Sequence, residues 1–351
     1  MSLAFKYIGL KYLKSFLIVF LSLLIFFVSM DIMAVFNKLP SSAGLKLLYI
    51  LNSAHFQATI IVPLAILFGF VLFVLNLIKN NIFTAIYSVG LSKIDLMKPV
   101  FFIAFAITSL MLVTQSTQLA YAEDVKKRIL KGTYFDTQKD NIFLKYDDFF
   151  VYFGKLYPLQ KKATNIKIFK IIENKLIYEI EANTATYENN AWILKDVKTI
   201  IQDKENGLKI IKNKSKTILE GFKPKIMDKV YEVKNRYSII DAIDTYSLLR
   251  TQNIDTNAIR ASFYWSAILP FFVLCGIVLI FSYISTNARF FDKNLFVLSS
   301  LGFSIFLWGV LFFLYKLSSS NKILPELSLL LPFILLNVIT IWIYNNKKGN
   351  L

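Results

Sequence analysis

Apolar residues are concentrated in six long stretches, three before and three after a mostly polar segment that covers residues 123–260. A helix that crosses a bilayer needs about 20 predominantly apolar residues. The pattern therefore predicts six membrane-spanning helices, over residues 15–36, 56–78, 99–120, 261–284, 295–315 and 325–344. Pro63, Pro270 and Pro332 fall inside these stretches and are expected to kink the helices. The chain is predicted to be an α-helical membrane protein of three plus three spans.

The polar segment between the two groups of spans shows the patterns of β-strands. β-Branched and aromatic residues are enriched, or apolar and polar residues alternate, over residues 141–151, 164–172, 175–182, 191–201 and 207–219. Turn-forming residues such as Asn, Asp and Gly separate these runs. We therefore expect an inserted all-β sandwich or jellyroll. Ser238 and Asp241 then form a capping-box pattern that begins a helical return to the membrane. The predicted domains are 1–122, 123–260 and 261–351.

The distribution of basic residues predicts the orientation in the membrane. The chain of 351 residues has a formal net charge of +17. If the N-terminus is inside, the cytoplasmic side carries Lys6, Lys11, Lys14, Lys79, Lys93, Lys98, Arg289, Lys293, Lys347 and Lys348. The short outer loops carry only Lys38, Lys46, Lys316 and Lys322. The positive-inside rule then places both termini in the cytoplasm and the β domain outside. The membrane accounts for the basic character, and no nucleic-acid partner is expected.

The composition offers little for catalysis. The single histidine, His55, lies at the outer end of the second span, and the single cysteine, Cys275, lies inside the fourth. With one cysteine, no disulfide within the chain and no cysteine metal cluster can form. Gly154-Lys155 lacks the earlier glycine of a phosphate-binding loop, because Phe149 stands there. We expect no catalytic residues, no cofactor, no bound metal and no ATP hydrolysis by the chain itself.

Asp31 is an acidic residue inside or near the outer end of the first span. A charge at such a depth is costly and often functional. The alternatives are that Asp31 lies at the membrane interface, or that it pairs with a nearby lysine such as Lys38.

The loop between the second and third spans has the pattern of a short amphipathic helix. The i, i+3, i+4, i+7 spacing is filled by Phe83, Ile86, Tyr87 and Gly90. Gly90 is suited to end that helix in a left-handed conformation, and Ser92 with Asp95 restarts a helix through a capping box. Such a helix with an aromatic face suits docking into the groove of a partner, and the alternative is a helix that rests on lipid headgroups.

Several segments, in this order, resemble the LptF/LptG family, the permease subunits that extract lipopolysaccharide from the bacterial inner membrane. They are Tyr7–Phe16 followed by Asp31, Ala85–Ser92, Tyr152–Leu156 and Tyr187–Val197. Ala85–Ser92 is similar to the family's coupling helix, which ends in glycine, a hydrophobic residue and serine. The opening and the last spans favour LptG. The family usually has an acidic residue near the start of the coupling helix, where this chain has Asn80 and Asn81.

The resemblance implies a subunit of an ABC transporter, a permease rather than an enzyme. Its partners would be a sister six-span subunit in an LptF/LptG heterodimer, the cytoplasmic ATPase LptB, and LptC, with lipopolysaccharide passed to a periplasmic bridge. The coupling helix would cover about 80–91, with ATPase contacts at Phe83, Ala85, Ile86, Tyr87, Gly90, Leu91 and Ser92. The candidate lipopolysaccharide contacts are Asp31, Lys38, Lys46, Lys316 and Lys322, and interfacial anchoring is the alternative for each lysine.

Three other classes of protein compete with this interpretation. An ABC permease of the MacB/FtsX kind has four spans and a large domain after the first, which the three-plus-three layout disfavours. A membrane enzyme that acts on lipid or glycan would need a cluster of acidic or histidine residues, whereas the outer loops hold only His55 and Glu326. A scaffold for a β domain would need one span, not six.

Overall fold

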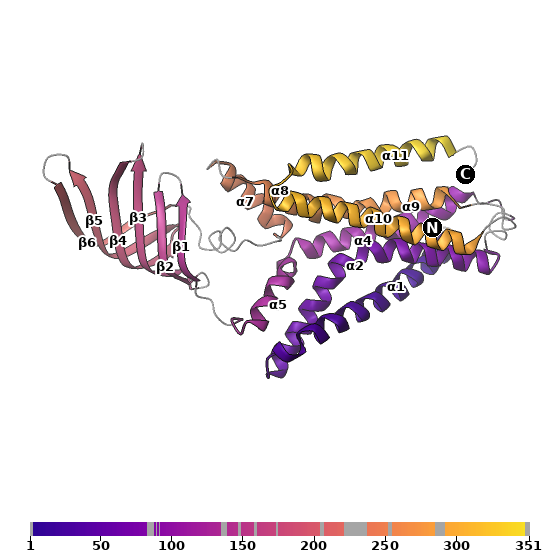
Figure 1. The fold of residues 1–351 in the computed structure, drawn as a ribbon, viewed down its shortest axis with the longest axis horizontal. Helices are drawn as coiled ribbons and strands as arrows, with labels where there is room; N and C mark the ends of the chain where they lie inside the picture. Colours follow the sequence, from indigo (N-terminus) through magenta and orange to yellow (C-terminus); the bar gives the residue numbers. More distant parts are fainter. Residues whose placement is uncertain are drawn as a thin grey trace. The chain divides into compact units, whose positions relative to one another are not determined.

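The computed structural model describes residues 3–82, 88, 90, 92–134, 139–146, 149–157, 160–172, 175–203, 207–220, 237–251, 255–284 and 292–347. The chain forms two compact units (Figure 1). The helical unit comprises Met1–Lys131, Asn235–Tyr246 and Asp255–Leu351, and the sheet unit comprises Gly132–Lys234 and Ser247–Ile254. The described residues 123–131 and 237–246 belong to the helical unit in this division.

Six helical segments are long and apolar enough to cross a membrane, as predicted. Spans one to three are α1 (Leu3–Val35) with a 3-10 turn at Phe36–Lys38, α2 (Ala43–Lys79) and α4 (Lys93–Gln115). Span four is Asn257–Ser282, span five is α10 (Lys293–Ser319), and span six is Glu326–Asn346. The helical unit also contains a 3-10 turn at Gln118–Tyr121 and α5 (Ala122–Leu130). The short helix α7 (Ile239–Thr251) precedes span four.

Spans four and six are irregular where the sequence predicted kinks. Span four consists of α8 (Asn257–Phe263), a π-helical turn at Tyr264–Ile268, a 3-10 turn at Leu269–Phe271 and α9 (Phe272–Ser282). Span six begins with a π-helical turn at Glu326–Leu330 and continues as α11 (Leu331–Lys347). Pro270 and Pro332 each lie two residues after the end of a π-helical turn. Proline has no backbone N–H and therefore cannot donate the usual helical hydrogen bond. A π-helical turn next to the proline changes the pattern of these backbone hydrogen bonds. Pro63 lies within the continuous helix α2.

The core of the helical unit lies around spans two and four, which carry many of its buried side chains. Span one packs closely on span two at Gly69. A Cβ atom on Gly69 would lie 2.7 Å from the Cα atom of Phe16, so only glycine allows this approach. One turn away along span one, the fully buried Tyr12 donates a hydrogen bond to the carbonyl oxygen of Ile66 over 3.2 Å. The contact therefore combines close backbone packing with a satisfied polar group.

The sheet unit contains one antiparallel sheet in the order β1-β2-β3-β4-β5-β6. The strands are β1 (Lys139–Tyr146), β2 (Phe149–Tyr157), β3 (Lys162–Ile172), β4 (Lys175–Glu188), β5 (Ala191–Asp203) and β6 (Gly207–Ile218). The prediction of an inserted all-β domain is confirmed. Among the described residues, the strands of this predicted jellyroll follow one another in the sheet in sequence order, as a meander. The predicted strand 141–151 is in fact a hairpin, because Tyr146 of β1 pairs with Phe149 of β2.

Alternate side chains of the sheet form the core of this unit. Trp192 of β5 and Phe153 of β2 are almost completely buried, and their ring centroids are 5.4 Å apart. Tyr187 of β4 contacts Trp192 edge to face, with 5.6 Å between the ring centroids. The contact between Phe153 and Trp192 thus links strands β2 and β5, which are not hydrogen-bonded neighbours, whereas Tyr187 and Trp192 face each other on the paired strands β4 and β5.

Candidate functional site

The start of α4 has the predicted capping geometry. The Asp95 N–H donates to the Ser92 hydroxyl over 3.2 Å, and the Ser92 N–H donates to the Asp95 carboxylate over 3.2 Å. Asp95 also accepts a hydrogen bond from Lys98 over 2.8 Å. The capping box that we inferred from Ser92 and Asp95 is therefore confirmed. It fixes the direction in which the chain enters span three.

Gly90 has the predicted left-handed backbone, with a φ of +81°. A Cβ atom there would meet no neighbouring atom within 4 Å, so the conformation rather than space favours glycine. Phe83, Ala85, Ile86, Tyr87 and Leu91 lie outside the described residues. The amphipathic helix that contains them stays a prediction, while Gly90 and Ser92 are both exposed.

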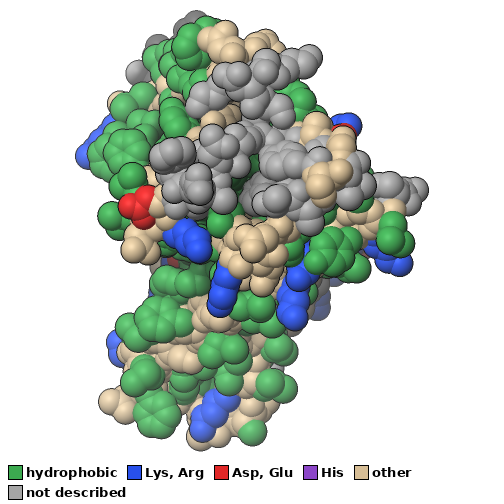
Figure 2. All heavy atoms as spheres, turned by 90° about the vertical axis from the view of Figure 1, so that its right-hand side faces the viewer, with side chains coloured by type: hydrophobic (Ala, Val, Ile, Leu, Met, Phe, Trp, Pro, Cys, Tyr) green, Lys and Arg blue, Asp and Glu red, His purple; other side chains and the backbone are tan. Residues whose placement is uncertain are grey.

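Figure 2 looks onto the end of the helical unit where this loop lies. Lys and Arg side chains are spread over that face among apolar ones, and few acidic side chains are visible. This is the end that the positive-inside rule assigned to the cytoplasm.

Asp31 is the centre of a buried polar cluster at the opposite end of the helical unit. Its carboxylate accepts hydrogen bonds from the Tyr49 hydroxyl over 2.8 Å and from the Ser53 hydroxyl over 2.5 Å, both on α2. It also accepts one from the ammonium group of Lys126 on α5 over 2.7 Å. Asp31 thus pairs with Lys126, not with the nearby Lys38 that we considered.

Lys126 is itself enclosed, since only 9% of its side chain is exposed. Its ammonium group lies 5.3 Å from the centre of the Tyr49 ring and 5.2 Å from that of Phe56. A buried cation of this kind needs a carboxylate partner and aromatic faces to offset the loss of water. Sequence analysis did not identify Lys126, because it is one of three consecutive basic residues on a short helix and nothing local marks it.

The four lysines that we proposed as ligand contacts are exposed at the same end of the unit as Asp31. They are Lys38, Lys46, Lys316 and Lys322. Lys316 is the most constrained, because its ammonium group lies 5.5 Å from the ring centre of Phe312 and 5.8 Å from that of Tyr315. This end of the helical unit therefore carries exposed positive charge in addition to the enclosed pair of Asp31 and Lys126.

A second ion pair joins spans four and six near this end. The Arg260 guanidinium donates to the Glu326 carboxylate over 2.5 Å, and the Tyr264 hydroxyl donates to the same oxygen over 3.1 Å. A cavity of about 230 Å³ lies beside them and is lined in part by Tyr246 of α7. Both π-helical turns contribute to this junction, since Tyr264 begins one and Glu326 the other.

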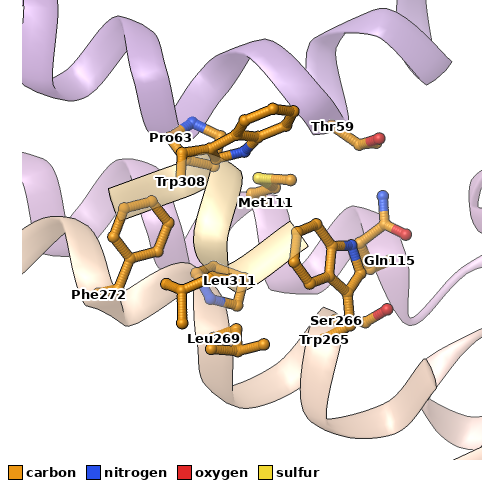
Figure 3. A pocket seen from close by; sticks show the side chains of 11 residues that line it. Thr59, Pro63, Met111, Gln115, Trp265, Ser266, Leu269, Phe272, Trp308 and Leu311 are labelled. Atoms are coloured by element: carbon orange, nitrogen blue, oxygen red, sulfur yellow. The ribbon is translucent and has the colours of Figure 1, made fainter. Parts of the chain in front are cut away.

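A small cavity of about 30 Å³ lies among spans two to five (Figure 3). Thr59, Gln115 and Ser266 contribute polar atoms to its lining, and Trp265 and Trp308 contribute rings. The side-chain nitrogen of Gln115 is buried without a protein partner. A cavity with these polar groups has room for a water molecule.

A much larger groove, about 980 Å³ in volume, lies at the other end of the unit. Its walls are span three, span four and span six, and the start of span one contributes Phe5. The lining is dominated by aromatic and aliphatic side chains. Nothing in the sequence analysis pointed to this groove, because its walls come from spans that are far apart in the sequence.

Spans one and five each expose a long apolar face. Leu21, Ile25 and Phe26 on α1 are at least half exposed, as are Leu298 and Phe306 on α10. Such faces require lipid or another membrane protein as neighbours.

The chain matches the family model described as lipopolysaccharide export system permease LptF/LptG over residues 6–346. A comparison with curated proteins finds no match. Because the family match covers essentially the whole chain, the chain belongs to the LptF/LptG family. It is therefore a multi-pass protein of the inner membrane from a family of transport permeases. The family model describes LptF and LptG together and does not distinguish them.

Proposed function

Because the chain belongs to the LptF/LptG family, we propose that it is one transmembrane subunit of an ABC transporter for lipopolysaccharide. In this proposal it extracts lipopolysaccharide from the inner membrane and passes it to a periplasmic bridge toward the outer membrane. A separate cytoplasmic ATPase supplies the energy. The observation that carries the proposal is the family match over residues 6–346, with six apolar spans around an inserted antiparallel sheet.

We place both termini in the cytoplasm and the sheet unit in the periplasm. The support is the excess of lysine and arginine in the short loops on the side of the termini. In this orientation the loop at Gly90 faces the cytoplasmic ATPase. The cluster of Asp31 and Lys126 then lies near the periplasmic surface.

We propose that the loop around Gly90 docks on an ATPase of the LptB kind. Its contacts would be Phe83, Ala85, Ile86, Tyr87, Gly90, Leu91 and Ser92. Two features support this role: the left-handed backbone at Gly90 and the capping box that starts span three. In the proposal they connect the predicted surface helix to span three, so that a displacement of that helix by the ATPase would move the span.

We propose that lysines at the periplasmic end meet the phosphate groups of lipopolysaccharide. Lys38, Lys46, Lys316 and Lys322 are exposed there, and a lysine–phosphate contact is a strong, charge-assisted hydrogen bond. Asp31 takes part in a different way, because its carboxylate already accepts three hydrogen bonds. In the proposal it holds Lys126 at this end of the unit.

We further propose that the exposed apolar faces of α1 and α10 contact the sister subunit of an LptF/LptG heterodimer. Their large side chains would be covered by matching spans rather than by lipid alone. The sheet would join LptC and the bridge by strand pairing, the usual way in which an open edge of a sheet binds another chain.

The first test is to purify the tagged chain in a mild detergent and to identify associated proteins and lipids by mass spectrometry. Recovery of an ABC ATPase, a second six-span subunit and lipopolysaccharide is the expected result. An ATPase without the sister subunit or lipopolysaccharide would indicate a different ABC permease. Absence of any ATPase would contradict the proposal.

The second test addresses coupling. Gly90→Pro or Tyr87→Asp should abolish transport-linked ATP hydrolysis while the chain still inserts, because proline cannot adopt a positive φ and a charge disrupts an apolar contact. Gly132→Pro is a matched control, since Gly132 also has a left-handed backbone, with a φ of +71°, and open space around it. Normal lipopolysaccharide transport by Gly90→Pro would refute the coupling role.

A further inference from the structure

The large groove between span three and spans four and six is built from a repeated local pattern. Leu269-Pro270-Phe271 in span four and Leu331-Pro332-Phe333 in span six have the same three residue types, and each follows a π-helical turn. The phenylalanine after each proline lines the groove. The two spans therefore contribute to this surface in the same way.

The equivalence continues deeper in the groove. Cys275 and Asn337 both stand five residues after the prolines, and both line the groove. The Cys275 thiol donates a hydrogen bond to the Asn337 side-chain oxygen over 3.4 Å. Asn337 also donates to the backbone oxygen of Phe333 over 2.8 Å, so its side-chain oxygen and one of its amide N–H groups have partners within the protein. Most of the residues around this pair are apolar.

Lys98 lines the groove at the end nearest the chain termini, where Phe5 and Tyr344 also lie. Its side chain is 63% exposed, and its ammonium group contacts Asp95 over 2.8 Å. An ammonium group has three N–H donors, so among the described residues this contact leaves donors for another acceptor. The groove thus combines a large apolar volume with a cation near the start of span three.

We propose that this groove binds an anionic phospholipid. An acyl chain lies along Phe101, Phe271 and Phe333, and the headgroup phosphate accepts hydrogen bonds from Lys98. The site faces the leaflet on the side of the termini, so the proposal does not require the chain to export lipopolysaccharide.

The lining favours a lipid over a protein helix as the occupant. Helices that pack in membranes place small residues at their interface so that the backbones approach closely. The described residues that line this groove are rich in phenylalanine, and Thr340 is the one small residue of that kind among them. A flexible acyl chain fits between such rings, and a basic residue at the membrane surface attracts anionic lipid.

The experiment uses the full-length chain in phosphatidylethanolamine vesicles that contain phosphatidylglycerol with a photoreactive acyl chain. After irradiation, mass spectrometry locates the labelled residues. We expect labels on spans three, four and six at the groove. Val278→Trp, which fills the groove, should reduce this labelling to background, and Ile341→Trp provides a second variant at its rim. Leu298→Trp on the exposed face of α10 is the control and should leave groove labelling unchanged.

The headgroup contact is tested with Lys98→Gln. The preference for phosphatidylglycerol over phosphatidylethanolamine at the groove should fall about fivefold, the factor for roughly 1 kcal/mol per basic residue at an anionic surface. Lys131→Gln, on an exposed lysine at the other end of the unit, should not change it. Groove labelling that survives both tryptophan variants would overturn the proposal, as would a partner helix that crosslinks to the groove and excludes the lipid.

Discussion

One ion pair of the helical unit and one of the sheet unit differ in how far they are enclosed. In the helical unit, Asp31 and Lys126 come from positions 95 residues apart, and 21% and 9% of their side chains are exposed. In the sheet unit, Lys167 of β3 faces Glu181 of β4 directly across the strand register, and 38% and 31% of their side chains are exposed. The first pair joins distant segments and is enclosed, whereas the second joins neighbours and remains in contact with water.

This difference predicts a difference in energetic weight. A buried charge that loses its partner keeps its desolvation penalty, so breaking such a pair is strongly destabilising. An exposed pair is screened by water and salt, and its loss costs little. The contribution of an ion pair therefore depends on its enclosure rather than on its length, because Lys126–Asp31 and Lys167–Glu181 are almost equally short, at 2.7 and 2.6 Å.

The largest expected effect is that of Asp31→Asn. The substitution keeps the shape of the side chain but leaves Lys126 without a counter-charge, so the free energy of unfolding should fall by about 3 kcal/mol. Thermal or denaturant unfolding of the detergent-solubilised chain measures the change. Asp31→Asn combined with Lys126→Met should recover most of the loss, because methionine packs against the rings of Tyr49 and Phe56 without a charge.

Glu123→Gln is the matched control on the same helix. Glu123 pairs with Lys127 over 2.7 Å, and 52% of the Lys127 side chain is exposed. Its removal should cost no more than about 0.5 kcal/mol, the usual value for a helical pair at this spacing. Equal losses in Asp31→Asn and Glu123→Gln would contradict the importance that we assign to enclosure.

An intermediate effect is expected from packing in the helical unit. Gly69→Ala places a Cβ atom 2.7 Å from the backbone of Phe16, so spans one and two must separate. Overpacking of this kind costs about 2 kcal/mol. Gly309→Ala on span five is the control, because a Cβ atom there meets nothing within 4 Å. Unfolding midpoints of the two variants in the same detergent test this, and equal midpoints would show that the Gly69 contact does not constrain the spans.

Features that depend on neighbouring residues could be predicted from the sequence, whereas features that depend on distant partners could not. The six spans, the Ser92–Asp95 capping box and the left-handed Gly90 all depend on residues close together in sequence, and all were predicted. The hairpin between β1 and β2 was missed because Asp147-Asp148 stands in a run of strand-forming residues without glycine or proline. A single predicted strand then replaced two.

The sites formed by distant residues gave no local signal. Asp31 was recognised as unusual because a carboxylate in an apolar span is rare, but its partner Lys126 resembles any lysine of a surface helix. The walls of the large groove come from spans three, four and six, and the sequence shows these spans without showing how they pack. The sequence therefore predicts the helices and strands, but not which of them pack against one another.

The smallest expected effect concerns the exposed pair of the sheet, and it appears in the pH dependence. The hydrogen bond from Lys167 is the main cause that holds the pKa of Glu181 below its ordinary value of 4.5, and the bond to Glu181 raises the pKa of Lys167 above 10.5. The contribution of Glu181 is therefore present above pH 4.5 and is lost as the pH falls through its lowered pKa. That of Lys167 is present below pH 10.5 and is lost as the pH rises through its raised pKa.

Glu181→Gln should consequently destabilise the sheet by no more than about 0.5 kcal/mol near neutral pH, because the pair is partly exposed. Glu179, whose carboxylate lies 3.6 Å from the Lys167 ammonium, replaces part of the lost charge. Hydrogen exchange of β3 and β4 peptides, compared between variant and parent at each pH, should show a difference that disappears in acid and shrinks in high salt. Glu188→Gln at the end of β4 is the control. A loss as large as that of Asp31→Asn would mean that the exposed pair matters as much as the enclosed one, and the contrast between the two units would fail.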